Sequence, residues 1–168
     1  QIDNLNQIAS EFSRFANMPS LKIETLDMLP LLNDTANMFI HEKTEIQINA
    51  LLTKAVVDAD LSQLRRMFIN LIRNSMQANA TKISIKVVDD KINYKVLFSD
   101  NGNGIKESEK EKIFDDNFTT KKQGMGLGLS LAKRFMTSIN GEIKLNSSSP
   151  QETTFEIIFP IKSRSITK

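Results

Sequence analysis

Helical and strand periods alternate along most of the chain. In residues 1–18 the apolar positions recur at intervals of three and four, as in a heptad seam. These positions are Leu5, Ile8, Phe12 and Phe15. The spacing predicts one helix that ends before Pro19. Since a lone amphipathic helix of this length is marginally stable in water, we expect its seam to need a partner.

From Leu21 onward the pattern predicts one domain over residues 21–162, with residues 1–20 as a separate helical unit and 163–168 as a tail. Helices are expected over residues 27–42, 60–80 and 127–140, and strands over 21–26, 45–52, 82–88, 93–99, 142–146 and 153–159. The stretch between residues 104 and 123 is typical of a lid. The last strands should pair as hairpins, which favours an α+β fold. We expect a two-layer sandwich with helices on one face of a mixed, mostly antiparallel sheet.

Composition removes several classes of function. The chain has 168 residues, with 40% hydrophobic and 25% charged residues, as in a globular domain with a short extra element. It has no cysteine and one histidine, which excludes disulfides, thiolate zinc sites, cysteine nucleophiles and multi-histidine metal sites. The net charge of +2 is too balanced to indicate a nucleic-acid partner. Because the chain begins at Gln1, we interpret it as a fragment of a longer protein.

Five of the six glycines fall in two clusters, at Asp100–Gly104 and Gly124–Leu129. Glycine after a strand allows close approach to a ligand, and glycine leading into a helix exposes N–H groups that suit phosphate. Each cluster alone is as well explained by a flexible loop. Two clusters on either side of one lid favour a nucleotide site. The P-loop and dinucleotide patterns both fit poorly, because their spacing is absent.

The helix predicted over residues 60–80 has two different faces. Its apolar face consists of Leu61, Leu64, Phe68, Leu71, Ile72 and Ser75. Its opposite face consists of Arg66, Asn70, Asn74 and Gln77. That polar face is either a simple solvent face or a metal site. Two asparagines one turn apart suit Mg²⁺, a hard cation that retains most of its waters and also contacts phosphate.

Four segments of the chain together resemble the sequence boxes of sensor histidine kinases. Asn70–Ser75 is similar to the N box, and Asp100–Gly104 to the first glycine box. Ile113–Lys121 is similar to the F box, and Gly124–Leu129 to the second glycine box. The resemblance implies the ATP-binding domain of the family that includes gyrase, Hsp90 and MutL, with its Bergerat fold. Residues 1–18, with the motif Phe12–Pro19, resemble the end of the second dimerisation helix. The F box and this helix end are most similar to those of nitrogen-regulation sensor kinases.

The resemblance also implies roles for individual residues. Asp100 would accept a hydrogen bond from the adenine amino group, and Asn74 would ligate Mg²⁺. Asn70, beside the metal or its waters, and Lys121, at the γ-phosphate, would be the catalytic residues, although Lys121 is equally well explained as an exposed lysine. Phe114 and Phe118 would anchor the lid. The implied ATP-binding set is Asn70, Asn74, Gln77, Asp100, Gly102, Gly104, Ile105, Phe118, Thr120, Lys121, Gly124, Gly126, Gly128 and Leu129.

The chain departs from the family pattern at three positions. Gln77 and Ala78 replace a Lys-Tyr pair, and Ser75 replaces the usual alanine. Asn70 stands where related ATPases have a glutamate base, so hydrolysis should be poor and transfer to a side chain favoured. The only histidine, His41, lacks the context of a phosphoacceptor, and we interpret it as a surface residue.

The resemblance therefore implies the ATP-binding kinase domain of a two-component sensor histidine kinase, with ATP and Mg²⁺ as ligands. The γ-phosphate would pass to a histidine outside this chain and then to a response-regulator aspartate. The implied partners are its own dimerisation and phosphotransfer domain, a receiver domain and a second copy in a membrane-anchored protein with this part in the cytoplasm. The alternatives are a non-catalytic nucleotide-sensing scaffold, a serine-kinase anti-sigma factor and, least favoured, a gyrase-like motor.

Overall fold

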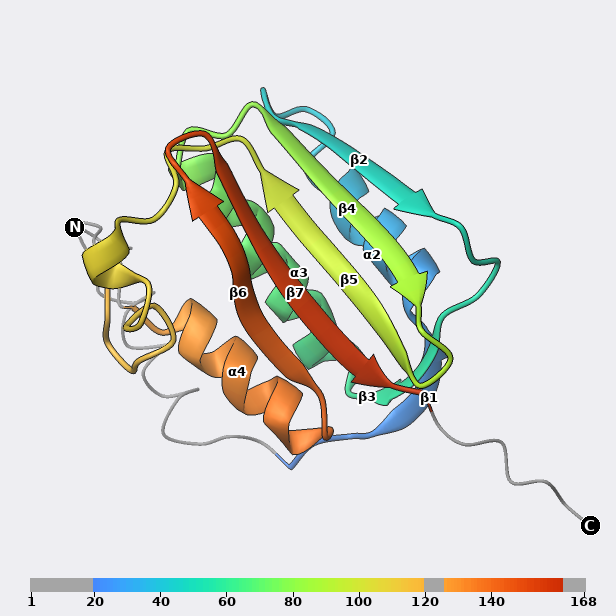
Figure 1. The fold of residues 1–168 in the computed structure, drawn as a ribbon. Helices are drawn as coiled ribbons and strands as arrows, with labels where there is room; N and C mark the ends of the chain where they lie inside the picture. The colour runs from blue at the N-terminus through green and yellow to red at the C-terminus, as the bar shows by residue number, and fades with distance from the viewer. Residues whose placement is uncertain (1–19, 120–125, 162–168) are drawn as a thin grey trace, which may run out of the picture.

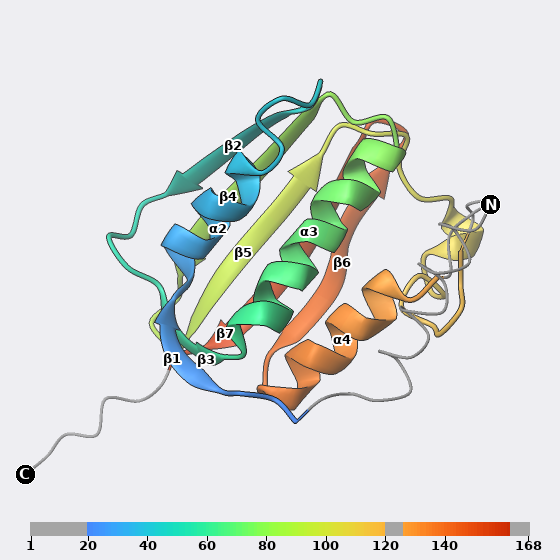
Figure 2. The same cartoon turned by 180° about the vertical axis from the view of Figure 1, so that it is seen from behind.

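Three helices lie on one face of a five-stranded sheet in residues 20–119 and 126–161, the part of the chain that the computed structural model describes (Figures 1 and 2). The helices are α2 (Met28–Asn37), α3 (Leu61–Gln77) and α4 (Gly128–Ser138). The sheet consists of β2 (Glu45–Ala50), β4 (Lys82–Asp89), β5 (Asn93–Asp100), β6 (Glu142–Ser149) and β7 (Glu152–Pro160). The predicted two-layer α+β sandwich is confirmed.

The sheet is mixed but mostly antiparallel, as predicted. Its strand order is β2-β4-β5-β7-β6. Strand β2 runs parallel to β4, and the other neighbours are antiparallel. Hairpins join β4 to β5 and β6 to β7, so the expected pairing of the last strands is confirmed. In this order β5 is the central strand, held on one side by β4 and on the other by β7.

The predicted element boundaries are wrong at the start of the domain. The first strand, β1, covers Glu24–Asp27 and pairs antiparallel with β3 (Val56–Ala59), a strand that the sequence pattern did not predict. Helix α2 ends at Asn37 and not at residue 42. The chain turns after it because Met38 and Ile40 have no buried face to join and are 62% and 70% exposed. The helix expected over residues 1–18 and the tail over 163–168 lie outside the described residues.

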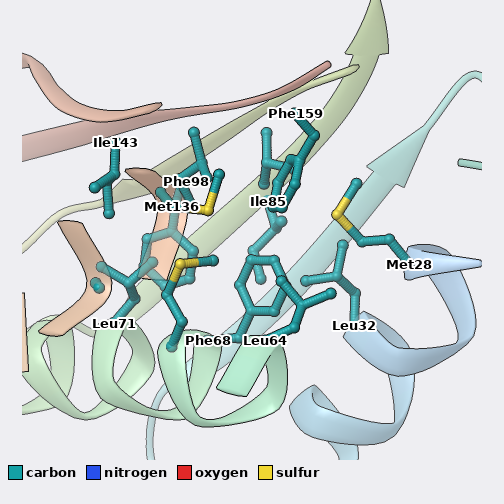
Figure 3. Close-up of a cluster of buried hydrophobic side chains, with 14 of the residues drawn as sticks. Met28, Leu32, Leu64, Phe68, Leu71, Ile85, Phe98, Met136, Ile143 and Phe159 are labelled. Atoms are coloured by element: carbon teal, nitrogen blue, oxygen red, sulfur yellow. The ribbon is translucent and has the colours of Figure 1, made fainter. Parts of the chain in front are cut away.

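The core lies between the helices and the sheet (Figure 3). Helix α3 contributes Leu64, Phe68, Leu71 and Ile72, as its apolar face predicts, and these pack with α2, α4 and the inner side chains of the strands. The prediction that Leu61 belongs to the buried face is wrong, because Leu61 is the first residue of α3 and is 37% exposed. The buried face therefore starts one turn later than the periodicity indicates, and this packing fixes the direction in which the polar face of α3 points.

The side chain of Asp60 accepts hydrogen bonds both from the start of α3 and from the segment near Lys22. One carboxylate oxygen accepts a hydrogen bond from the N–H of Gln63 at 3.0 Å, which caps the helix. The other accepts one from the N–H of Lys22 at 2.8 Å. Partial burial raises the pKa of Asp60, but the N–H groups of Lys22, Gln63 and Ser62 outweigh it and lower the pKa overall.

Replacing Asp60 by alanine should lower the free energy of unfolding by about 1 kcal/mol at pH 7, since the helix loses its cap. The lowered pKa means that this stabilisation is present above the ordinary value of 3.8 and is lost as pH falls through the folded-state pKa. Urea unfolding across this range measures it, with Asp34→Ala at an exposed position of α2 as the control. A difference between Asp60→Ala and the parent that does not change with pH would contradict the assignment.

Candidate functional site

Three segments that are far apart in the sequence meet at one end of the sandwich: the C-terminal end of α3, the loop after β5 and the turn between β6 and β7 (Figures 1 and 2). A fourth segment, the N-terminal end of α4, lies beside Asn70 in the middle of α3. Three of these four segments carry the sequence boxes described above. The fold therefore brings the predicted boxes together.

Asp100 is the last residue of β5 and its side chain is buried. One carboxylate oxygen accepts a hydrogen bond from the N–H of Gly102 at 2.9 Å. The other accepts one from the hydroxyl of Ser75 at 2.6 Å. Each carboxylate oxygen has two acceptor positions, so two donors leave acceptor capacity on the group. Asp100 is therefore fixed in place and still able to accept a hydrogen bond from a ligand.

The first glycine cluster closes onto the C-terminal end of α3. Asn103 donates its N–H to the carbonyl of Ala78 at 2.8 Å. A Cβ on Gly102 would lie 2.7 Å from the same carbonyl oxygen. Glycine is needed here because no side chain fits between the loop and the helix end. This close contact sets the distance between Asp100 and the polar face of α3.

The start of the lid rests on the β6–β7 turn. Gly104 has a positive φ of 76°, and a Cβ there would lie 2.0 Å from the carbonyl oxygen of Ser149. The next residue, Ile105, donates its N–H to the hydroxyl of Ser148 at 2.9 Å. The two contacts hold the chain where it leaves the sheet. The lid therefore has a fixed base.

Asn70 faces the N-terminal end of α4. A Cβ placed on Gly128 would lie 3.7 Å from the amide nitrogen of Asn70. Asn74, one turn later, is half-buried. Helix α4 begins after Leu127, whose side chain has no polar atom to cap the first N–H groups, whereas α2 and α3 each begin with a capping aspartate. The amide of Asn70 thus lies beside the positive end of α4, a position that suits an anion.

The outer part of the lid packs onto β7 and α4. The ring of Phe114 meets that of Phe155 edge to face at 6.2 Å, and the ammonium of Lys133 lies 5.7 Å from the Phe114 ring centre. Asp116 forms an ion pair with Arg134 of α4. Phe114 and Phe118 are half-buried against the core, as expected for lid anchors. The segment between Glu107 and Glu109 is a short 3₁₀ helix.

The remaining predicted residues have different outcomes. Ile105 and Leu129 are half-buried and pack against the core, whereas Gln77 is exposed. Gly126 has a positive φ of 66°. A Cβ on Gly126 would lie 2.4 Å from the carbonyl oxygen of Phe118, so both ends of the intervening segment are close together. The predictions for Thr120, Lys121 and Gly124 lie outside the described residues.

His41 is exposed in the turn after α2, as its interpretation as a surface residue predicts. In residues 20–119 and 126–161 no group of three or more His, Asp or Glu side chains is placed to hold a metal ion. No helix within the same residues has the length and apolar character needed to cross a bilayer.

Sequence reasoning missed three residues that shape the site. Ser75 was placed on the apolar face of the helix and noted as a replacement for alanine, but its hydrogen bond to Asp100 was not predicted. Its position on an apolar helix face was the available signal, because a buried hydroxyl needs a partner. Ser148 and Arg134 hold the lid, and no local pattern in the sequence identified either of them.

The structure resembles solved histidine kinase domains. The catalytic domain of histidine kinase ThkA superimposes with a TM-score of 0.75 over 83% of this chain and 96% of that one, at 26% identity. The curated relatives include sensor histidine kinase ZraS of Escherichia coli K12, which is 26% identical over 96% of this chain and 36% of its own length. Sporulation kinase A of Bacillus subtilis is 30% identical over 88% of this chain and 24% of its own length.

The chain therefore spans about a quarter to a third of the length of these two curated relatives. The family profile of histidine kinase-, DNA gyrase B- and HSP90-like ATPases matches residues 59–163, which include α3, the lid, α4 and strands β4 to β7. That stretch is more than half of the chain. The chain belongs to this ATPase family, as an ATP-binding catalytic domain of the sensor histidine kinase type.

Proposed function

We propose that this domain binds ATP with Mg²⁺ between α3 and the lid and donates the γ-phosphate to a histidine outside the chain. The observation that carries the proposal is that a buried acceptor, two half-buried amides and the uncapped start of α4 all lie along the C-terminal half of α3. An adenine, a metal ion and a phosphate chain require these three kinds of group.

Asp100 would take the adenine end of the nucleotide. A carboxylate only accepts hydrogen bonds, so it selects the amino group of adenine against the carbonyl of guanine. Gly102 and Gly104 would let the base lie close to the backbone, since the first has no room for a Cβ and the second has a positive φ. Ile105, Phe118 and Leu129 would supply apolar contacts.

The phosphate end would lie between α3 and α4. Gly124, Gly126 and Gly128 would present N–H groups to the phosphates, and Thr120 and Lys121 would contact them from the lid. Asn70 and Gln77 would complete the set from α3. The support is the contact between Gly128 and Asn70, which puts an amide beside the positive end of a helix.

The donor set fits Mg²⁺. Asn74 would ligate the ion through its amide oxygen, with Asn70 beside the metal or its waters, and phosphate oxygens and water would complete the coordination. Mg²⁺ favours such oxygen ligands and keeps several waters. The ion would neutralise phosphate charge, which is what phosphoryl transfer needs. The described residues hold no acidic cluster that would make a dedicated all-protein cage.

Transfer to a side chain is favoured over hydrolysis because α3 carries Asn70 at the position of a general base. An amide cannot take a proton from water, and general-base help is typically worth about 10²–10⁴-fold in rate. The acceptor would be a histidine on a dimerisation helix. Residues 1–20 would be the end of the second such helix, followed by the catalytic domain at 21–162 and a tail at 163–168.

In the whole protein the partners would be its own dimerisation and phosphotransfer domain, a second copy, and the receiver domain of a response regulator. The domain would act in the cytoplasm, attached to a membrane anchor elsewhere in the chain. ZraS and sporulation kinase A, the relatives described above, are kinases by name. The nitrogen-regulation subfamily stays a prediction.

Incubation with ATP labelled at the γ-phosphate tests the reaction. We expect this chain to remain unlabelled alone and to label a dimerisation domain that carries the acceptor histidine when that domain is supplied. His41→Ala is the control, since His41 is exposed in a turn after α2. Label on the chain that survives this substitution would show another acceptor.

A non-catalytic nucleotide sensor is the second candidate, because Gln77 and Ala78 replace the Lys-Tyr pair of the family pattern. Such a protein would bind ATP and Mg²⁺ with the same residues. Binding without any transfer to the supplied domain would favour the sensor over the kinase. Substantial ATP turnover by this chain alone would instead favour a hydrolysing motor.

A further inference from the structure

Ser75 and Asp100 form a buried hydrogen bond that joins the two layers of the fold. Ser75 lies on the inner face of α3 and is 3% exposed, and Asp100 ends the central strand and is 7% exposed. The hydroxyl oxygen lies 2.6 Å from a carboxylate oxygen. Hydrogen bonds of this length from a hydroxyl to a charged acceptor are among the stronger ones in proteins.

The backbone of Asp100 is already fixed before its side chain is considered. It pairs with Ile83 of β4 on one side and with Thr153 of β7 on the other. The remaining freedom is rotation of the carboxylate group. The N–H of Gly102 holds one oxygen and the hydroxyl of Ser75 holds the other, so the plane of the carboxylate is set by two donors from different segments.

We infer that Ser75 is a positioning residue that orients the Asp100 carboxylate toward the amino group of a bound adenine and so contributes to base selectivity. The inference rests on the proposed binding of ATP by this site. Ser75 acts through Asp100 and not on the nucleotide directly. An alanine at this position would leave one oxygen of a buried carboxylate without its donor, free to rotate or to take up water.

Loss of the Ser75 hydroxyl should affect only the contact between Asp100 and the exocyclic amino group of the base. ATP carries this group, whereas purine riboside triphosphate lacks it and is otherwise the same. Loss of orientation at Asp100 should weaken the contact with ATP and leave the analogue unaffected. A general loosening of the site would weaken both nucleotides to the same degree.

The experiment is a calorimetric titration of the chain with each nucleotide in the presence of Mg²⁺. We expect the parent to prefer ATP over the analogue, and Ser75→Ala to lose about tenfold in ATP affinity with the analogue unchanged. Ser75→Cys should behave like Ser75→Ala, because a thiol keeps the volume but is a weak donor. Thermal unfolding establishes that each variant is folded at the titration temperature.

Thr35→Val is the matched control. The hydroxyl of Thr35 is buried in α2 and donates to the carbonyl of Leu31 at 2.7 Å. The substitution therefore removes a buried helix hydroxyl outside the site. It should leave both affinities unchanged. Equal weakening of ATP and analogue by the Ser75 variants, or no weakening, would overturn the inference while the parent still binds ATP. A parent chain that binds neither nucleotide would overturn the proposed function as well.

Discussion

Replacing Asp100 by asparagine is expected to weaken ATP binding by about 10- to 100-fold, which corresponds to roughly 1–3 kcal/mol. Asparagine presents one oxygen and one N–H₂ group where the carboxylate presents two oxygens. The N–H of Gly102 can only donate, so the amide oxygen of the asparagine is expected to face Gly102. The N–H₂ group of the asparagine then faces Ser75. The acceptor proposed for the adenine amino group then becomes weaker or is replaced by a donor.

Calorimetric titration with ATP measures the change, and thermal unfolding establishes that Asp100→Asn is folded. Asp34→Asn makes the same substitution at an exposed position of α2 and should bind ATP like the parent. An affinity for ATP that is the same in Asp100→Asn and in the parent would mean that Asp100 does not contact the base. The buried carboxylate would then have only a structural role.

Gly104→Ala should lower the free energy of unfolding by about 3 kcal/mol and weaken ATP binding with it. The positive φ of 76° costs an alanine about 1–2 kcal/mol, and overpacking costs about 1–3 kcal/mol. The new Cβ would meet the Ser149 carbonyl at 2.0 Å, a backbone atom in the β6–β7 turn that cannot rotate away. The loop and the turn must separate, and the base of the lid separates with them.

Urea unfolding of Gly104→Ala measures the stability, with Gly128→Ala as the matched substitution. The atoms nearest to a Cβ on Gly128 lie 3.7 Å or more away, and this glycine is the first residue of α4, so alanine fits there without overpacking. Its stability should therefore equal or exceed that of the parent. If Gly104→Ala were as stable as the parent, the loop would not be held against the β6–β7 turn.

The long periodic elements could be predicted from the sequence, and the short ones could not. Helix α3 shows a clear apolar face over 17 residues, so its position and its polar face were correct. Strand β3 has four residues and owes its conformation to pairing with β1, which no local pattern reports. The end of α2 was missed because Met38 and Ile40 are apolar enough to continue a helix but are exposed in the fold.

The site could be predicted as far as the order of its boxes along the chain. Sequence spacing showed that α3, Asp100 and the glycine segments occur together, but it carried no distances. Two contacts arise from packing between segments that are 25 or more residues apart. They are the Ser75–Asp100 hydrogen bond and the close approach of Gly104 to the backbone of Ser149. Contacts over such separations depend on the complete fold.

The central claim is tested most directly by following backbone amide resonances of the chain while ATP and Mg²⁺ are added. The account predicts that the resonances that move belong to the C-terminal half of α3, to residues 100–105 and to the first turn of α4, all with one shared affinity. Resonances of β2, at the far edge of the sheet, should stay in place. Shifts confined to other surfaces, or no shifts at millimolar ATP, would contradict the account.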